Sequence, residues 1–461
     1  MSTQEQQKCP ACGTSAGSSC GAGTASVTRT SCGAALPLRQ GPVISLADLG
    51  GKGDGSFLNT ALLQQALDQC GQAGGGTVVI PAGTWCSGPV MMSSHTTLIL
   101  EEGAILRGDA RDPLFVPAYI GAPAQAHEAL IMAHECEDIV IAGAGVIDGN
   151  GATFGWAEAE EWRGQLRAGN EAAFLERFPG VKTANGMPRP WLVELSHVHK
   201  AVLQGVTIKD SPMWTLVLRQ CNDVLLEGVT VSAPLDAPNT DGIDIIACDQ
   251  VVVRHCDIST GDDNIAVKSG LNQDGSPASR NITIADCIIR SGHGLSIGSE
   301  TANGIGAVTV DRVRFLETEN GIRIKSARDR GNQIGPLIVH DATMTDVATP
   351  IFITCSYGGQ SGALGQSFTT TLDEEPVTAT TPFIHDIEIV GVKATGAQLA
   401  TVVSGLPESL IKGVQLSDLD IESKVGLLGR YCEGSIINAK IKVAEGEPIV
   451  RGPEYHLREA R

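Results

Sequence analysis

The sequence predicts an all-β fold in which the chain winds as a parallel β-helix, a solenoid of stacked coils. Pairs of apolar residues separated by one residue recur through its middle at steps of 27, 22, 30, 27 and 29 residues. Alternation of this kind indicates strands, and a repeat of about 20–30 residues indicates a solenoid. A second series of apolar pairs, with Gly, Asn and Asp between, gives each coil at least two strands. The first series is Leu216/Leu218, Ile243/Ile245, Ile265/Val267, Leu295/Ile297, Ile322/Ile324 and Ile351/Ile353.

Composition limits the partners that this chain could have. With 461 residues and 55 glycines, it can form one long solenoid with many tight turns. A net charge of −19 argues against nucleic acid as a partner. The same charge repels an anionic polymer at long range, so local cations would have to hold such a substrate. The sequence contains no run of 18 apolar residues, so we expect no membrane span.

Residues 1–40 are predicted to be a polar, disordered tail. Cys9, Cys12, Cys20 and Cys32 lie in it, and the spacing of the first two is compatible with a zinc or redox pair. Because no second CxxC follows, we favour a tail without a metal site. No signal peptide is visible, which predicts a cytoplasmic protein as the sequence stands, or a secreted or periplasmic one if the start is trimmed.

Residues 41–461 are predicted to form one β-helix domain. A helix near residues 60–70, capped by Asn59, would cover the open end of the solenoid, and three glycines at 74–76 would end it. Residues 152–188 break the repeat and contain a helix-like run, so we expect a long inserted loop there. The coils are predicted to end near residue 450.

Aligning the repeats brings distant polar residues together. Asp241, Asp263 and His293 each stand two positions before the first apolar residue of a pair. Stacked strands lie about 4.8 Å apart, so these side chains should form one column, with Asp262 beside it. Two positions apart on a later strand, Arg323 and Lys325 should face the same side. The result is a predicted patch of three carboxylates, an imidazole and two cations.

This region contains four short motifs in a fixed order: Asn239-Thr240-Asp241-Gly242, Gly261-Asp262-Asp263, Gly292-His293-Gly294 and Arg323-Ile324-Lys325. Together they resemble the polygalacturonase family, glycoside hydrolase family 28. The resemblance implies a right-handed β-helix that hydrolyses α-1,4-galacturonide bonds with inversion and without a cofactor or metal.

Carried over by motif, the resemblance also implies residue roles. Asp262 would be the general acid, Asp241 and Asp263 would activate water, and His293 would tune the carboxylates. Arg323 and Lys325 would hold a galacturonate carboxylate. Further candidates for substrate binding are Tyr357 (one coil on), Asn239 and Lys268. The expected partner is a galacturonate polymer or oligomer, and the protein itself is expected to be a monomer.

The chemistry of the patch gives two expectations. Three clustered carboxylates cannot all ionise cheaply, so one should have a raised pKa and supply the acid. The second concerns stereochemistry. One coil step is about 4.8 Å, whereas inverting enzymes separate their carboxyl groups by about 6.5–9.5 Å. Distance alone therefore favours retention, and we follow the resemblance in expecting inversion.

Several alternatives remain open from the sequence. We expect exo action, because the insertion at 152–188 and loops at 271–280 and 357–382 could close one end of a groove. Other pectic chains, such as rhamnogalacturonan or xylogalacturonan, are alternative substrates. A calcium-dependent pectate lyase and a non-catalytic carbohydrate-binding β-helix are also possible. Trp214 is expected to pack in the core, and Cys256 and Cys287 to stack as free thiols.

Overall fold

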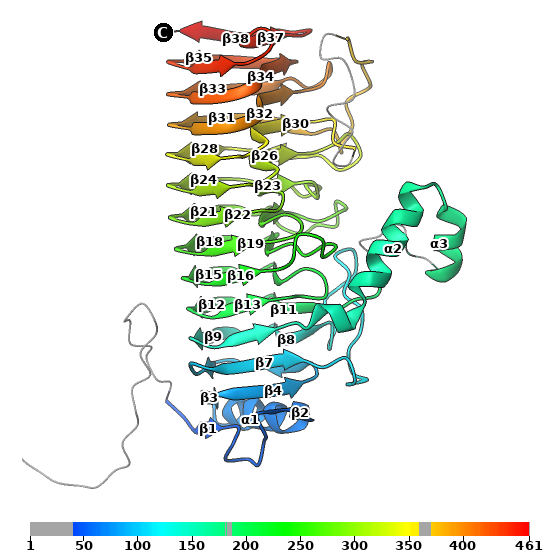
Figure 1. The fold of residues 1–461 in the computed structure, drawn as a ribbon, viewed down its shortest axis with the longest axis vertical. Helices are drawn as coiled ribbons and strands as arrows, with labels where there is room; N and C mark the ends of the chain where they lie inside the picture. The colour runs from blue at the N-terminus through cyan, green and yellow to red at the C-terminus, as the bar shows by residue number, and fades with distance from the viewer. Residues whose placement is uncertain (1–39, 180, 182–186, 359–369, 461) are drawn as a thin grey trace, which may run out of the picture.

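The chain forms a long cylinder of stacked coils, seen from the side in Figure 1. The computed structural model describes residues 40–179, 181, 187–358 and 370–460. The predicted tail and its four cysteines lie outside the described residues, apart from Gln40. Strands of successive coils pair in parallel, in two long sheets that run from one end of the cylinder to the other. The predicted right-handed parallel β-helix is confirmed.

A full coil has three strands. In one central coil these are β15 (Asn222–Glu227), β16 (Thr230–Ser232) and β17 (Ile243–Ile246). The third strand of each coil belongs to a row whose outer face carries the predicted patch. This row contains β5 (Val90–Met92), β8 (Ala129–His134), β11 (Trp191–Ser196), β14 (Leu216–Arg219), β17, β20 (Ile265–Lys268), β23 (Leu295–Gly298), β26 (Asn320–Lys325), β30 (Thr349–Thr354), β32 (Lys393–Ser404), β34 (Asp420–Arg430) and β37 (Ile449–Arg451).

The predicted register is confirmed in this row. Leu216 pairs with Ile243, which pairs with Ile265, and the series continues through Leu295 and Ile322 to Ile351. All members of the apolar pairs are buried, because they point inward and stack on their equivalents in the next coil. The residues between them therefore face outward along shared columns.

Helix α1 (Thr60–Gln72) covers the N-terminal end of the cylinder, as predicted (Figure 1). It buries Leu63, Ala66, Leu67 and Cys70 against the solenoid core. Asn59 is the N-cap residue, as predicted, but its side chain makes no hydrogen bond to the helix. The buried amide instead donates to the carbonyl oxygens of Lys52, Phe57 and Cys86. Asn59 thus ties the entry loop to the neighbouring strand.

The insertion at 152–188 contains a 3-10 turn, Gly151–Phe154, and helices α2 (Trp156–Arg167) and α3 (Glu171–Arg177). Figure 1 shows the two helices projecting sideways from the cylinder. They have a small apolar core of their own, in which Trp162 meets Phe174 and Phe178 edge-on. The predicted helix-like run is confirmed, as a hairpin with its own packing.

The coils continue to β38 (Tyr455–Ala460), so the predicted end near residue 450 is wrong. The sequence did not predict β38 because most of its residues are exposed and several are charged; β36 (Lys440–Val443) also carries charges. The packing predictions for Cys256, Cys287 and Trp214 are confirmed: all three are buried, and both thiols are free.

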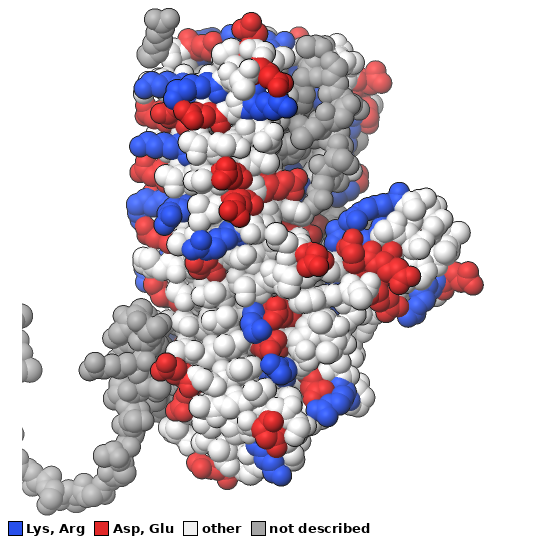
Figure 2. Space-filling view, in the orientation of Figure 1, with Lys and Arg blue, Asp and Glu red and all other residues white. Residues whose placement is uncertain are grey.

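Among the described residues, no helix is long and apolar enough to cross a bilayer. The face in Figure 2 mixes acidic and basic side chains.

Candidate active site

The predicted polar patch lies on the outer face of β17, β20, β23 and β26. Asp241, Asp263 and His293 each precede a strand of this row, and the ladder stacks the turns that carry them. Gly242 N donates to Asp263 O at 2.8 Å, and His293 N donates to Asp262 O at 2.9 Å. The backbone of each coil thus fixes the position of the next, and distant sequence segments form a single site.

Asp263 lies among cations. Lys325 Nζ is 2.6 Å from its Oδ2 and Arg323 Nη1 is 3.5 Å from its Oδ1, to which Ser296 Oγ also donates at 2.8 Å. Burial alone would raise the pKa of Asp263, but Lys325 and Arg323 outweigh it and hold that pKa well below its usual range. Asp263 is therefore held in its ionised form.

Asp262 and His293 form a hydrogen-bonded pair. His293 Nδ1 is 2.9 Å from Asp262 Oδ1, which also accepts Asp263 N at 3.0 Å. Burial would raise the pKa of Asp262, but the bond and charge of His293 bring it below its usual value. For His293, burial works to lower the pKa, and Asp262 outweighs this and raises it. The pair favours an imidazolium beside a carboxylate in the free enzyme.

The glycines on both sides of His293 are required by close approach between coils. Gly292 and Gly294 have φ of +70° and +87°. A Cβ on Gly294 would lie 2.0 Å from Asn320 O, and one on Gly292 would lie 2.6 Å from Asp262 O. These glycines let the turn pass between its neighbours and present the imidazole to Asp262.

Lys268 is the counter-ion of two buried carboxylates. Its Nζ lies 3.1 Å from Asp241 Oδ2, 2.6 Å from Asp244 Oδ1 and 3.7 Å from the Trp214 ring centroid. Burial alone would lower the pKa of Lys268, but Asp241 and Asp244 hold it well above its usual value. Lys268 is only 2% exposed, so its role here is to neutralise the buried carboxylates of Asp241 and Asp244. The pairing of Asp244 with Lys268 was not predicted from the sequence.

The raised pKa of the site falls on Asp241. Burial raises its pKa well above the ordinary range, although the Lys268 charge opposes this, and burial raises the pKa of Asp244 to about 7. The sequence predicted one raised pKa among three carboxylates, and the resemblance gave the acid role to Asp262. In the free enzyme, however, His293 keeps the pKa of Asp262 low. The raised pKa therefore falls on a different carboxylate from the one to which the resemblance gave the acid role.

Asn239 and Tyr357 occupy different surroundings. Asn239 is 3% exposed, and its Oδ1 accepts Arg189 Nη2 at 2.9 Å. Arg189 also donates to the Pro212 and Pro238 carbonyl oxygens, so it anchors the turn before Asp241; sequence reasoning missed this anchor. Tyr357 stands beside the predicted cation pair, with its ring centroid 5.4 Å from both Arg323 Cζ and Lys325 Nζ.

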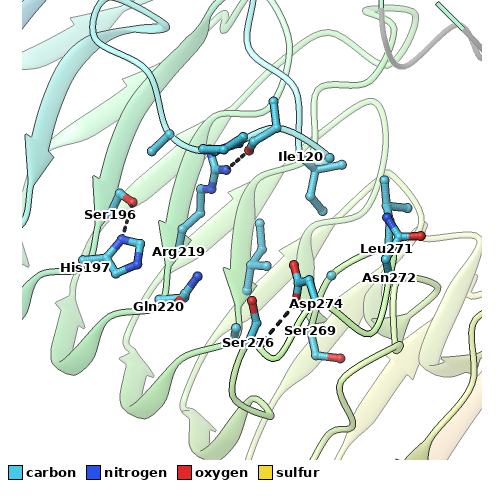
Figure 3. A pocket seen from close by; sticks show the side chains of 17 residues that line it. Ile120, Ser196, His197, Arg219, Gln220, Ser269, Leu271, Asn272, Asp274 and Ser276 are labelled. Atoms are coloured by element: carbon cyan, nitrogen blue, oxygen red, sulfur yellow. Dashed lines mark hydrogen bonds between the residues drawn. The ribbon is translucent and has the colours of Figure 1, made fainter.

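An apolar wall covers the outer face of the row on the N-terminal side of Asp241. Trp191 and Trp214 stack with ring centroids 5.4 Å apart, and the segment at 118–122 packs over them. Arg219 donates to Ala122 O, which holds this segment in place, as Figure 3 shows from close by. We call this cluster the apolar wall: Ala118, Ile120, Ala129, Met132, Trp191, Met213, Trp214, Val217, Ile246 and Ala247.

The wall also meets a loop from the opposite edge of the row. A Cβ on Gly121 would lie 3.2 Å from Leu271 Cδ1, so the two segments nearly touch. A pocket of about 270 Å³ lies between them, lined by Ser196, Arg219 and Gln220 among others (Figure 3). None of the predicted site residues lines it. The sequence did not predict that the segment at 118–122 packs over the outer face of the row.

Beyond the patch, the outer positions of the row are partly apolar and partly polar. On the C-terminal side, the column of Arg323 continues as Phe352 and Val402, which belong to a second apolar cluster. The neighbouring column, that of Lys325, stays polar there as Thr354 and Ser404. On the N-terminal side, Glu194 and Arg219 also stand at outer positions, where they form a buried ion pair. The predicted patch itself lies from β17 to β26, three coil steps or about 14 Å.

The carboxylates and imidazole of the patch do not fit a divalent cation. Ligand atoms of Asp262, Asp263 and His293 lie within 4.8 Å of one another. However, Lys325 and Arg323 already neutralise Asp263, and His293 Nδ1 is already hydrogen-bonded to Asp262. Adding a cation there would place it against existing positive charges. The donor set therefore favours acid–base chemistry by side chains.

Comparisons with known proteins identify similar sequences and a similar fold. The sequence profile described as glycosyl hydrolases family 28 matches residues 70–434. A probable polygalacturonase of Vitis vinifera is 29% identical over 394 residues, which cover 82% of this chain and 74% of that protein. An endo-polygalacturonase of Pectobacterium carotovorum subsp. carotovorum is 31% identical over 312 residues, covering 66% and 73%. The solved family 28 exopolygalacturonase of Yersinia enterocolitica shares the fold, with TM-score 0.73, 22% identity and coverage of 93% and 79%.

Proposed function

Because this chain belongs to glycosyl hydrolases family 28 and is an inverting glycoside hydrolase of the polygalacturonase type, we propose that it trims galacturonate chains from one end. The observation that carries the exo mode is the apolar wall beside Asp241. Trp214, a member of the wall, touches Lys268, and Lys268 contacts Asp241. A chain running past the catalytic carboxylates in that direction would meet buried apolar side chains.

The cations support galacturonate as the sugar. Arg323 and Lys325 stand on one strand at the open part of the patch, with Tyr357 beside them. A net charge of −19 disfavours an anionic substrate everywhere else, so a carboxylate would be held where these cations are. A planar guanidinium also matches a carboxylate in geometry.

The three carboxylates take distinct roles in the proposed hydrolysis. Asp263, kept ionised by Lys325 and Arg323, accepts a proton from the attacking water. Asp241 provides a second oxygen for that water, and Asp262 protonates the leaving glycosidic oxygen. A substrate carboxylate bound nearby adds negative charge, which raises the pKa of Asp262 towards that of a useful acid.

The exo mode is tested with a time course on polygalacturonate. We expect one short product of fixed size from the first minutes, while viscosity falls slowly for each new reducing end. The wall stands next to Asp241 and would leave little room on that side, which favours monomer as the product. Anion-exchange chromatography and viscometry on the same samples measure both quantities.

A hexagalacturonate labelled at its reducing end sharpens this experiment. If chain trimming starts from the unlabelled end, the label moves down the ladder one product length at a time. Mid-sized oligomers appearing together at early times would rule out exo action. Cleavage of rhamnogalacturonan or xylogalacturonan with no cleavage of polygalacturonate would instead reassign the substrate.

Removal of divalent cations is expected to leave the activity unchanged. The physical reason is that Lys325 and Arg323 occupy the carboxylate oxygens that a metal would need. The measurement is the release of reducing sugar before and after exhaustive dialysis against EDTA, with a parallel assay for unsaturated products. Loss of activity that calcium restores would contradict this and favour elimination over hydrolysis.

A further inference from the structure

Glu319 contacts the imidazole of the Asp262–His293 pair from the side opposite Asp262. Its Oε2 lies 3.4 Å from His293 Nε2, while Nδ1 lies 2.9 Å from Asp262 Oδ1. Backbone bonds hold Glu319 in place, since its N donates to Gly292 O at 2.8 Å and its carbonyl accepts Thr349 N at 3.0 Å. The coils therefore place a third carboxylate on the ring that the four motifs do not include.

We propose that Glu319 is a positioning residue that holds His293 in its doubly protonated form and so keeps a transferable proton on the Asp262–His293 pair. Two carboxylates on opposite ring nitrogens leave both nitrogens as donors, which is the hydrogen-bonding pattern of an imidazolium. Glu319 acts through His293. This inference rests on the proposed hydrolase mechanism, in which the pair supplies the acid proton.

The charged groups that face His293 come from two turns. Asp262 and Asp263, from the turn before β20, lie 2.9 and 3.8 Å from Nδ1, and Glu319, from the turn before β26, lies at Nε2. The nearby cations Arg323 and Lys325 contact Asp263, whose charge they offset. Glu319 is thus the facing carboxylate that the catalytic motifs do not use, and it raises the pKa of His293 together with Asp262 and Asp263.

The consequence is a specific change in pH dependence. A pKa raised by folding means that the protonated form persists to higher pH and is lost as pH rises through that value. If the pair must carry its proton, activity falls on the alkaline side at the same point. Removing the charge of Glu319 lets the proton leave at lower pH, so the alkaline limb moves towards acid.

The test compares Glu319→Gln with Glu317→Gln and Glu319→Asp. Because Glu319 is partly exposed, water screens it, and we expect kcat to fall about threefold on the alkaline limb. Activity at the acid side and KM should stay unchanged. Glu317 lies on the same turn and is exposed, so its variant controls for a lost surface charge. Glu319→Asp keeps the charge and should restore most of the alkaline limb.

A second readout does not depend on catalysis. NMR titration of the imidazole signals, with the His293 signal assigned from its absence in His293→Gln, follows the proton directly. We expect His293 to titrate at lower pH in Glu319→Gln than in the wild type or Glu317→Gln. An unchanged titration would overturn the inference, as would a raised KM with an unmoved alkaline limb. A wild type that cleaves no galacturonide but shows the expected titration would refute the proposed function alone.

Discussion

An Asp262→Asn enzyme is expected to fold normally and to lose about a thousandfold in kcat on polygalacturonate. The amide oxygen of Asn can still accept His293 Nδ1 and Asp263 N, the two bonds made by Asp262 Oδ1. The substitution therefore removes the transferable proton and little else. Steady-state kinetics and the melting temperature, measured together, separate lost chemistry from lost structure.

Rates measured on a galacturonide with a good aryl leaving group distinguish the general acid from the other carboxylates. Such a leaving group needs little protonation, so Asp262→Asn should recover much of its rate on it, whereas Asp263→Asn should not. Asp257→Asn, an exposed carboxylate that pairs with Arg290 on the surface, is the control for loss of charge. Full activity of Asp262→Asn on polygalacturonate would remove the acid role from this residue. Rescue of Asp241→Asn in its place would move the role to Asp241.

Replacing Lys268 with Met is expected to have the largest effect on stability. The change leaves Asp241 and Asp244 buried without their counter-ion, which costs about 3–5 kcal/mol in comparable buried pairs. Met keeps the apolar contact with Trp214 but not the charge. We expect a clearly lower melting temperature and loss of activity, because the remaining carboxylates will take up protons. Calorimetry and the rate on polygalacturonate measure the two effects.

A double variant distinguishes a missing charge from a general packing defect. In Lys268→Met with Asp244→Asn, one of the two uncompensated carboxylates is gone, so much of the lost stability should return. Lys442→Met removes a surface lysine that pairs with Glu422, and it should leave the melting temperature unchanged. If the single and double variants melt alike, the ion pairs of Lys268 do not hold this part of the fold together.

The apolar repeat was sufficient to predict the column of the site. A one-residue slip would turn every side chain of a strand to the other face, so the pairs Ile243/Ile245 and Ile265/Val267 fix the outward positions. Asp241, Asp263 and His293 follow from counting back two residues, and Arg323 from the strand itself. Their neighbours across the coils could be predicted because stacking distance and direction are constant in a solenoid.

Other features needed the tertiary structure. The end of the coils was missed because the last strands, β37 and β38, are mostly exposed and bury few apolar side chains. The side chain of Asn59 bonds to strand backbone instead of to the helix that follows it, and residue type alone does not distinguish the two. The segment at 118–122 crosses the outer face although nothing periodic marks it. Loop paths depend on packing at their destination, which sequence spacing does not encode.

The sequence by itself determined which residues share a wall of this protein: three aspartates, a histidine and two cations, brought into line by a repeated strand. Only the tertiary structure decided how protons and charges are distributed among them. Lys268 pairs with Asp241 and Asp244, His293 is held between Asp262 and Glu319, and Trp214 packs in the apolar wall against Lys268. The reason is that backbone register is periodic, whereas side-chain partners depend on burial and on loops that have no period.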